Sequence, residues 1–266
     1  AAGVEGCTVF AVTGEASGDG HVYSGQNWDW RVGTVDTVVA IRIVQPPKPT
    51  VIMQVEAGQI GRQGANSAGI ALKANGLNGS FPRRVGIPSP FIRRRVLDSA
   101  NMHDALQAVF SPKQAFCSNL LITHREGVAI DLETTPGRHG WLYPTAGILV
   151  HTNHFISHIP EHLTGSYRPS SEDSLYRIER MEKVLRRAGE ARDPAAMRAL
   201  IASGLRDHFG MPHSVCNHPD ERDDPLLRNQ TVASSIVDLT AGEYYIALGT
   251  PCNTDYQKLP WGLYQP

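Results

Sequence analysis

Cys7 is the residue of this chain whose type and position best suit covalent chemistry, because it follows a glycine in "GCT" and opens a β-type run. If the Gly6–Cys7 peptide bond were cut, Cys7 would carry a free α-amine beside its own thiol. Such an amine has an ordinary pKa of about 7.7–8.0, so it can accept the thiol proton near neutral pH. The glycine also leaves room for the thiol to attack the preceding carbonyl. Gly6 and Cys7 therefore form a candidate self-cleavage site, with Cys7 as the later nucleophile.

Two further residues could complete such a site. Asp29 ends the second strand of a predicted hairpin in "GQNWDW", which places it beside the start of the first strand, where it could orient the amine. Asn153 lies near the end of a later strand in "VHTNH", and its side-chain N–H₂ could stabilise a developing oxyanion. Alone, Cys7, Asp29 and Asn153 each have an ordinary structural interpretation. Together, and in this order, they favour catalysis.

Candidate pocket residues lie close to these positions in the sequence or on neighbouring strands. They are Trp28, Trp30, Glu56 and Asn75. Packing and turn stabilisation explain these residues equally well.

Two other kinds of site are consistent with parts of the sequence. Cys7 and His151 have the order and rough spacing of a papain-like pair, but the local cysteine motif of that class is missing and Cys7 opens a strand instead of a helix. His151, His154, His158 and His162 are spaced as metal ligands can be, although "VHTNHF" is typical of a strand end and Pro160 interrupts any helix. We expect no metal there.

Composition limits the function classes. The 266 residues carry a net charge of −1 and are 41% hydrophobic, which is ordinary for a folded domain and offers no basic surface for nucleic acid or membrane. The four cysteines are widely spaced with no C-x-x-C pair, so we expect neither a disulfide framework nor a cysteine zinc site. Free thiols are typical of a reducing compartment, and we therefore expect the protein to be cytoplasmic. We expect no cofactor, and the sequence leaves the oligomeric state open.

The predicted elements alternate in blocks. Strands are expected within residues 7–77, 115–154 and 230–249, and helices at 89–100, 101–110, 170–189 and 193–203. We expect Asn101, Ser170 or Ser171, and Asp193 to cap the helices. Strands in sequential hairpins with helices between the blocks predict a layered α+β domain.

Several of these segments together resemble the isopenicillin-N acyltransferase-like family of cysteine N-terminal-nucleophile hydrolases. The similar segments run in order from "GCT" and "GQNWDW" through "EAGQIGRQGANSAGIAL", "VHTNH" and "HSVCNH" to "SIVDLTAGEYYIALGTPCN". The resemblance implies a four-layer αββα sandwich of two mainly antiparallel sheets, and a precursor that cleaves itself before the cysteine. Carried over by position, it implies that Cys7 is the nucleophile, that Asp29 orients its amine and that Asn153 is the oxyanion donor.

The expected activity is hydrolysis of a small N-acyl or β-alanyl-type amide through an acyl-thioester. Transfer of the acyl group to an amine is the alternative, and a catalytically inactive relative that binds a small amide is the alternative of another class. We expect residues 1–6 to be the end of a leader whose earlier part is missing, and residues 7–266 to be one catalytic domain. The cleaved segment is a possible partner. Thr250 stands where the penicillin acyltransferase pattern has arginine, which puts penicillin-type chemistry in doubt.

Overall fold

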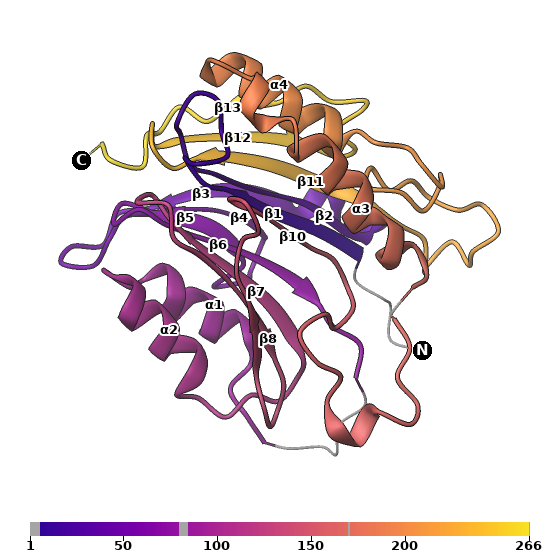
Figure 1. Ribbon diagram of the computed structural model, residues 1–266. Coiled ribbons are helices and arrows are strands. Elements are labelled where there is room, and N and C mark those ends of the chain that lie inside the picture. Colours follow the sequence, from indigo (N-terminus) through magenta and orange to yellow (C-terminus); the bar gives the residue numbers. More distant parts are fainter. Residues whose placement is uncertain (1–5, 80–84, 170, 266) are drawn as a thin grey trace.

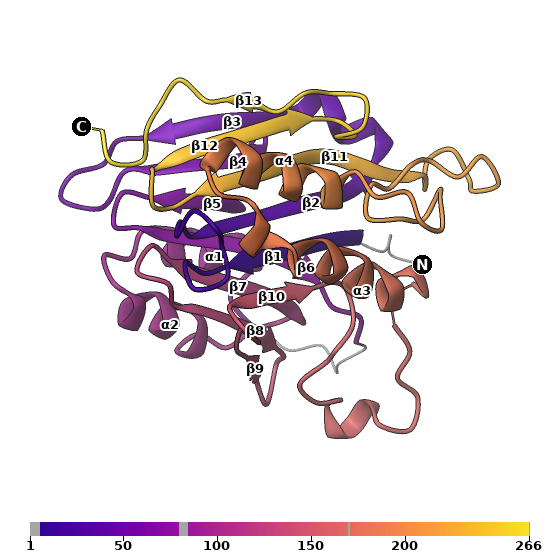
Figure 2. The ribbon, with the colours of Figure 1, turned by 45° about the horizontal axis from the view of Figure 1, so that its top comes forward.

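Two β-sheets lie face to face, and helices cover the outer face of each (Figure 1). The computed structural model describes residues 6–79, 85–169 and 171–265. Figure 2 shows the same layers turned toward the viewer, with α3 and α4 lying across one sheet. The four-layer αββα sandwich expected from the sequence is confirmed.

All named strand pairs are antiparallel. The first sheet has the order β10-β1-β2-β11-β12-β13, and its strands are β10 (Ile148–His151), β1 (Gly6–Val12), β2 (Tyr23–Arg31), β11 (Asn229–Asp238), β12 (Glu243–Leu248) and β13 (Gln257–Lys258). The second has the sequential order β3-β4-β5-β6-β7-β8-β9, from β3 (Val38–Ile43), β4 (Val51–Glu56), β5 (Gln63–Asn66), β6 (Ile70–Gly76), β7 (Ser118–His124) and β8 (Ala129–Thr134) to β9 (Gly140–Leu142).

Each helical pair buries an apolar face against one sheet. Helices α1 (Ser89–Leu97) and α2 (Met102–Phe110) share a core with β4, β6, β7 and β8, and α3 (Asp173–Leu185) and α4 (Pro194–Leu205) share one with β1, β2, β10 and β11. Short 3-10 helices span Val32–Thr37, Glu161–Leu163 and Ala188–Glu190. A third core lies between the sheets, where residues such as Ile52 and Val237 pack together. Burial of these faces supplies most of the folding free energy.

The helix starts follow their sequence signals in two of three cases. The side chains of Asn101 and Asp193 accept hydrogen bonds from backbone N–H groups at the starts of α2 and α4, as expected. The expectation for α3 was wrong for Ser171, because the helix begins at Asp173 after Glu172 and has no side-chain cap. Ser170 lies outside the described residues.

The position of β1 is what matters for the site. It lies inside the first sheet, between β10 and β2, so that Cys7 pairs with β2 on one side and meets the segment that follows β10 on the other, and α3 lies across β1. None of the described helices is both long and apolar enough to cross a bilayer.

Candidate active site

Cys7 and Asn153 meet where β1 begins and β10 ends. The antiparallel register pairs Val9 with His151, so the residues that follow β10 run alongside the start of β1. The backbone N–H of Cys7 donates to Oδ1 of Asn153 at 2.8 Å, and both residues are buried. The structure therefore brings together two of the three residues expected to be catalytic.

A buried arginine that the sequence analysis did not single out completes this contact. Arg177 on α3 donates from Nη1 to the carbonyl of Cys7 at 2.7 Å and to Thr8 Oγ1 at 3.0 Å, and from Nη2 to Asn153 Oδ1 at 2.9 Å. Its Nε donates to Asp173 Oδ2 at 2.5 Å. One guanidinium thus fixes the backbone of Cys7 and the amide of Asn153 at once.

The signal for this arginine was its place in the helical pattern. Arg177, Met181 and Leu185 are four residues apart and are all buried on the same face of α3. An arginine on an otherwise apolar stripe must have buried partners, because an unpaired buried charge is costly.

The orientation of the Asn153 amide is set by its partners. Its Oδ1 accepts from the Cys7 N–H and from Arg177, whereas its Nδ2 donates to the carbonyl of Gly76 at 3.0 Å. Two donors on one side and a carbonyl on the other allow only this orientation. In the uncut chain Asn153 therefore presents an acceptor to Cys7. The oxyanion role expected of its N–H₂ stays a prediction.

Asp29 lies beside the Gly6–Cys7 bond, as the hairpin predicted. The β1–β2 register pairs Gly6 with Asp29 and Cys7 with Trp28. Oδ1 of Asp29 accepts from Thr231 Oγ1 at 2.7 Å, and a Cβ added at Gly6 would lie 3.1 Å from Oδ2. Asp29 therefore fits closely against Gly6, and its role toward the amine stays a prediction.

Burial controls the acidity of Asp29. Loss of water raises the pKa of this carboxyl to about 6, against the lowering effects of the Arg177 charge and the Thr231 hydrogen bond. Asp173 shows the opposite balance: burial raises its pKa, but the neighbouring Arg177 charge is the first of several contacts that bring it below the usual value. Asp29 is thus a carboxyl that can gain or lose a proton close to neutral pH.

The four expected pocket residues have mixed surroundings. Trp28 is buried with Cys7 and Trp30 packs against this cluster, while the Arg62 guanidinium lies 4.3 Å from the Trp28 ring centre and 3.5 Å from Glu56 Oε2. Asn75 instead donates to the carbonyls of His151 and Thr152, at 3.1 and 2.9 Å, so it supports the segment that carries Asn153. Their role in binding substrate stays a prediction.

A small cavity of about 110 Å³ lies at the start of β1. Gly6, His213 and Asn217 line it, together with the carboxyl groups of Asp29, Asp173 and Asp223. Two larger hollows, of about 520 and 660 Å³, are lined by neither Gly6 nor Asp29. The cavity that touches the predicted scissile bond is therefore small and rich in carboxyl groups.

The histidines of "VHTNHFISH" have separate partners. His151 is buried, with Nε2 2.9 Å from Glu133 Oε1 and Nδ1 2.8 Å from the carbonyl of Thr152. Both neighbours accept hydrogen bonds, so both ring nitrogens donate. Burial lowers the pKa of His151, but the nearby carboxylates outweigh this and raise it.. With no lone pair to accept a thiol proton, His151 does not suit a papain-like pair.

The described side chains of His154 and His158 do not join His151 in one site. His154 Nδ1 is 2.8 Å from Ser174 Oγ, and His158 Nδ1 is 3.1 Å from Ser157 Oγ. The side chain of His162 lies outside the described part of the chain. Thr250 is buried in the turn after β12, where its Oγ1 accepts from Asn253 Nδ2 at 3.1 Å.

One curated relative is similar to most of this chain. A curated relative from Emericella nidulans, the 40 kDa form of acyl-coenzyme A:6-aminopenicillanic-acid-acyltransferase, is 30% identical over 233 residues, covering 87% of this chain and 62% of the relative. The chain therefore spans less than two thirds of that relative's length.

Two solved structures share the fold. A variant of conjugated bile acid hydrolase from Clostridium perfringens has a TM-score of 0.67 at 13% identity, covering 97% of this chain and 94% of that one. Penicillin V acylase from Agrobacterium tumefaciens has a TM-score of 0.56 at 15% identity, covering 91% and 83%.

The family comparison covers most of the domain. The family model described as acyl-coenzyme A:6-aminopenicillanic acid acyl-transferase matches residues 16–253. The match runs through both sheets and includes the residues that surround Cys7 in space, Asp29, Asn153 and Arg177. On this ground the chain belongs to the acyl-coenzyme A:6-aminopenicillanic acid acyl-transferase family.

Proposed function

We propose that this protein is an amide hydrolase that releases its own leader at Gly6–Cys7 and then uses Cys7 as an N-terminal nucleophile. The observation that carries the proposal is the convergence of Asn153, Arg177 and Asp29 on Cys7 and the residue before it. Asn153 and Arg177 contact the N–H and the carbonyl of Cys7, and Asp29 lies against Gly6. Such precise positioning of one backbone segment is what a self-cleaving bond needs.

The processing step begins with attack by the Cys7 thiol on the carbonyl carbon of Gly6. The Gly6–Cys7 C–N bond breaks as a C–S bond forms, and the thiol proton goes to the departing nitrogen. Water then hydrolyses the resulting thioester, which gives a leader that ends in a carboxylate and a mature chain that begins with the Cys7 amine. We assign the transfer of this proton to Asp29, which lies against Gly6 and whose pKa burial raises to about 6.

In the mature chain the Cys7 amine would take the thiol proton. The ordinary pKa values of a thiol and an α-amine differ by less than about one unit, so this transfer costs about 1 kcal/mol or less. The thiolate then attacks the substrate carbonyl, the amine product leaves with the proton, and water releases the acid from the acyl-thioester. Asn153 Oδ1, which accepts from the Cys7 N–H in the uncut chain, would accept from the amine and hold its lone pair toward sulfur.

The cavity favours a polar substrate with an amino group. Its lining includes Asp29, Asp173 and Asp223, and the pKa of Asp173 is held low by Arg177, so that carboxylate is ionised at neutral pH. Gly6 is itself part of the lining, so departure of the leader enlarges the space. We therefore place a β-alanyl-type amide ahead of an amide with a long apolar acyl chain.

Acyl transfer is the second candidate, and the name of the Emericella nidulans relative supports it. It differs from hydrolysis only in whether water or an amine attacks the acyl-thioester. Product analysis with a primary amine in excess separates the two reactions.

The test uses the full chain and its Cys7→Ala variant. Mass spectrometry should find the wild type beginning at Cys7 and the variant uncut. Released amine is then measured with β-alanyl amides, N-acyl amino acids and penicillins. We expect β-alanyl amides to react fastest and the variant to be inactive on all of them. A wild type that keeps its leader and binds amides without turnover would favour the non-catalytic alternative, and turnover by Cys7→Ala would refute the nucleophile.

A further inference from the structure

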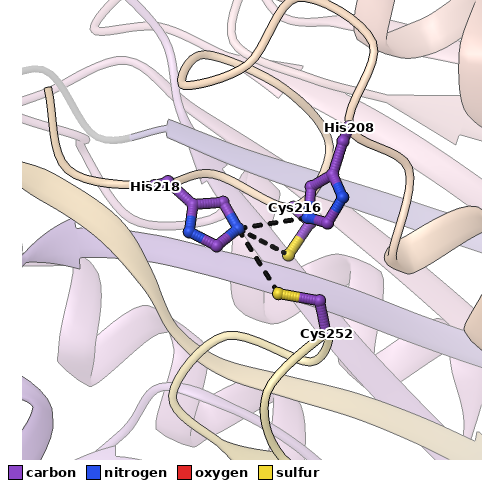
Figure 3. A group of neighbouring side chains, drawn as sticks. All are labelled: His208, Cys216, His218 and Cys252. Carbon is purple, nitrogen blue, oxygen red and sulfur yellow. Dashed lines mark hydrogen bonds between the residues drawn. The ribbon is translucent and has the colours of Figure 1, made fainter.

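Four side chains with metal-binding atoms meet in one place outside the site described above. They are His208, Cys216, His218 and Cys252, and their ligand atoms all lie within 4.8 Å of one another. Figure 3 shows both imidazoles and both sulfurs turned toward a common centre. Among the described residues, these four side chains form the cluster of possible metal ligands that is close enough together to hold an ion.

The four residues come from two loops that are distant in the sequence. His208, Cys216 and His218 lie between the end of α4 at Leu205 and the start of β11 at Asn229. Cys252 lies in the turn that follows β12. Because β11 and β12 are paired, their ends bring the two loops together. A contact made across 34 residues of sequence leaves no local motif, which is why the widely spaced cysteines indicated no metal site.

The distances from His218 Nε2 to the other three ligand atoms are close to the edges of a tetrahedral zinc site. With Zn–N near 2.05 Å and Zn–S near 2.3 Å, tetrahedral angles give edges of about 3.3 Å for N–N and about 3.6 Å for S–N. The His208 and His218 Nε2 atoms are 3.1 Å apart, and His218 Nε2 lies 3.6 Å from Cys216 Sγ and 3.4 Å from Cys252 Sγ. The remaining ligand atoms lie within 4.8 Å of one another, so the four side chains are close enough to surround one ion.

We propose that His208, Cys216, His218 and Cys252 bind one Zn²⁺ as a closed structural site. Two thiolates and two neutral imidazoles balance the charge of the ion and fill a tetrahedral shell, which leaves no position for a substrate. Binding requires that both thiols release their protons to solvent. Softer thiolate ligands with imidazoles select zinc over magnesium or calcium, which prefer oxygen ligands.

The zinc site would hold in place the loop that lines the cavity at Gly6. Asn217 lies between two of the proposed ligands, and its backbone exchanges two hydrogen bonds with Thr231: its N–H donates to Thr231 Oγ1 and its carbonyl accepts from the Thr231 N–H, both at 3.0 Å. The same Thr231 hydroxyl donates to Asp29. Asn217 also lines the cavity at Gly6. A metal that holds Cys216 and His218 in place therefore fixes the chain of contacts that ends at Asp29, a consequence that rests on the proposed function.

The metal itself is tested without reference to activity, in the Cys7→Ala background, where the nucleophile is absent. The protein is produced with added zinc and passed over a desalting column. Its zinc content per chain is then measured by elemental mass spectrometry. We expect about one zinc per chain. Cys216→Ser, Cys252→Ser and His218→Gln should each weaken zinc binding at least about 100-fold, so that little metal survives desalting. The matched controls Cys117→Ser and His103→Gln lie outside the cluster and should keep the metal.

A second measurement reports the coordination geometry of the bound metal. Replacement of zinc by Co²⁺ should give the intense visible bands of a tetrahedral cobalt thiolate site, and these bands should be absent in Cys216→Ser. The proposal is overturned if the wild type retains no zinc under these conditions, if the controls lose it as the cluster variants do, or if intact mass and thiol labelling show a Cys216–Cys252 disulfide. If zinc is present but amide hydrolysis is not, the metal site stands and the proposed function fails.

Discussion

Replacing Asp29 by asparagine should stabilise the folded chain while it removes a group that the proposed chemistry uses. The structure has Asp29 fully buried, and burial raises its pKa from 3.8 to about 6. Each pKa unit is worth about 1.4 kcal/mol, so ionised Asp29 costs the uncut fold roughly 3 kcal/mol at pH 7. Asparagine has nearly the same shape, and its Oδ1 can still accept from Thr231.

The sign follows from the direction of the shift. The folded-state pKa lies above the unfolded value, so the contribution of Asp29 favours folding below about pH 4 and is lost as pH rises through 6. Asp29→Asn should therefore raise the free energy of unfolding by up to roughly 3 kcal/mol at pH 7, or roughly 6–10 °C in Tm, and by almost nothing at pH 4.

The assay is urea unfolding at pH 4 and pH 7 in a Cys7→Ala background, so that both proteins keep Gly6 bonded to residue 7. The control is Asp36→Asn, an exposed carboxyl whose loss should change stability by less than about 0.5 kcal/mol. A gain of equal size at both pH values, or a loss at pH 7, would refute burial as the cause of the perturbed acidity.

Three more outcomes follow from the same contacts. Thr231→Val removes a hydrogen bond that lowers the pKa of Asp29, so the acidic limb of the processing rate should move up by about one pH unit, and an unmoved pH profile would rule out Asp29 as the titrating group. Gly6→Ala places a Cβ 3.1 Å from Asp29 Oδ2 and should slow leader release on denaturing gels, whereas Gly33→Ala, where a Cβ meets no atom within 4 Å, should not; equal rates would contradict the close fit. Arg177→Met removes one donor from the Cys7 carbonyl and from Asn153 and takes the buried positive charge away from Asp173, so it should cost about 3–5 kcal/mol in urea unfolding; a cost below about 1 kcal/mol would show that these contacts are not structural.

Sequence periodicity determined most of the strands and all four helices. Alternating apolar residues fix which face of a strand is buried, and local caps such as Asn101 and Asp193 fix where helices begin. Short strands were the exception. β5, with the sequence "QGAN", is fully buried although it has no apolar alternation, because its side chains are small or polar and Asn66 Nδ2 donates to the carbonyls of Leu97 and Ser99, at and just after the end of α1.

In the candidate site, too, some features could be predicted from the sequence and others could not. Cys7 and Asp29 belong to one hairpin, so the pairing of two neighbouring strands was enough to predict that Asp29 lies beside the Gly6–Cys7 bond. Asn153 was found by its strand-end position and by resemblance, yet which of its amide atoms faces Cys7 depends on Arg177 and Gly76, which come from another helix and the other sheet.

The sequence by itself thus predicted the layers, the candidate nucleophile and its nearest neighbour, because these depend on contacts between adjacent elements. Only the tertiary structure decided that Arg177 reaches the backbone of Cys7, that burial raises the pKa of Asp29 to about 6, and that Cys252 meets His218. Each of these depends on burial or on side chains far apart in the chain. The order of residues in the sequence shows neither burial nor long-range contacts directly, because desolvation and such contacts exist only once the layers have packed.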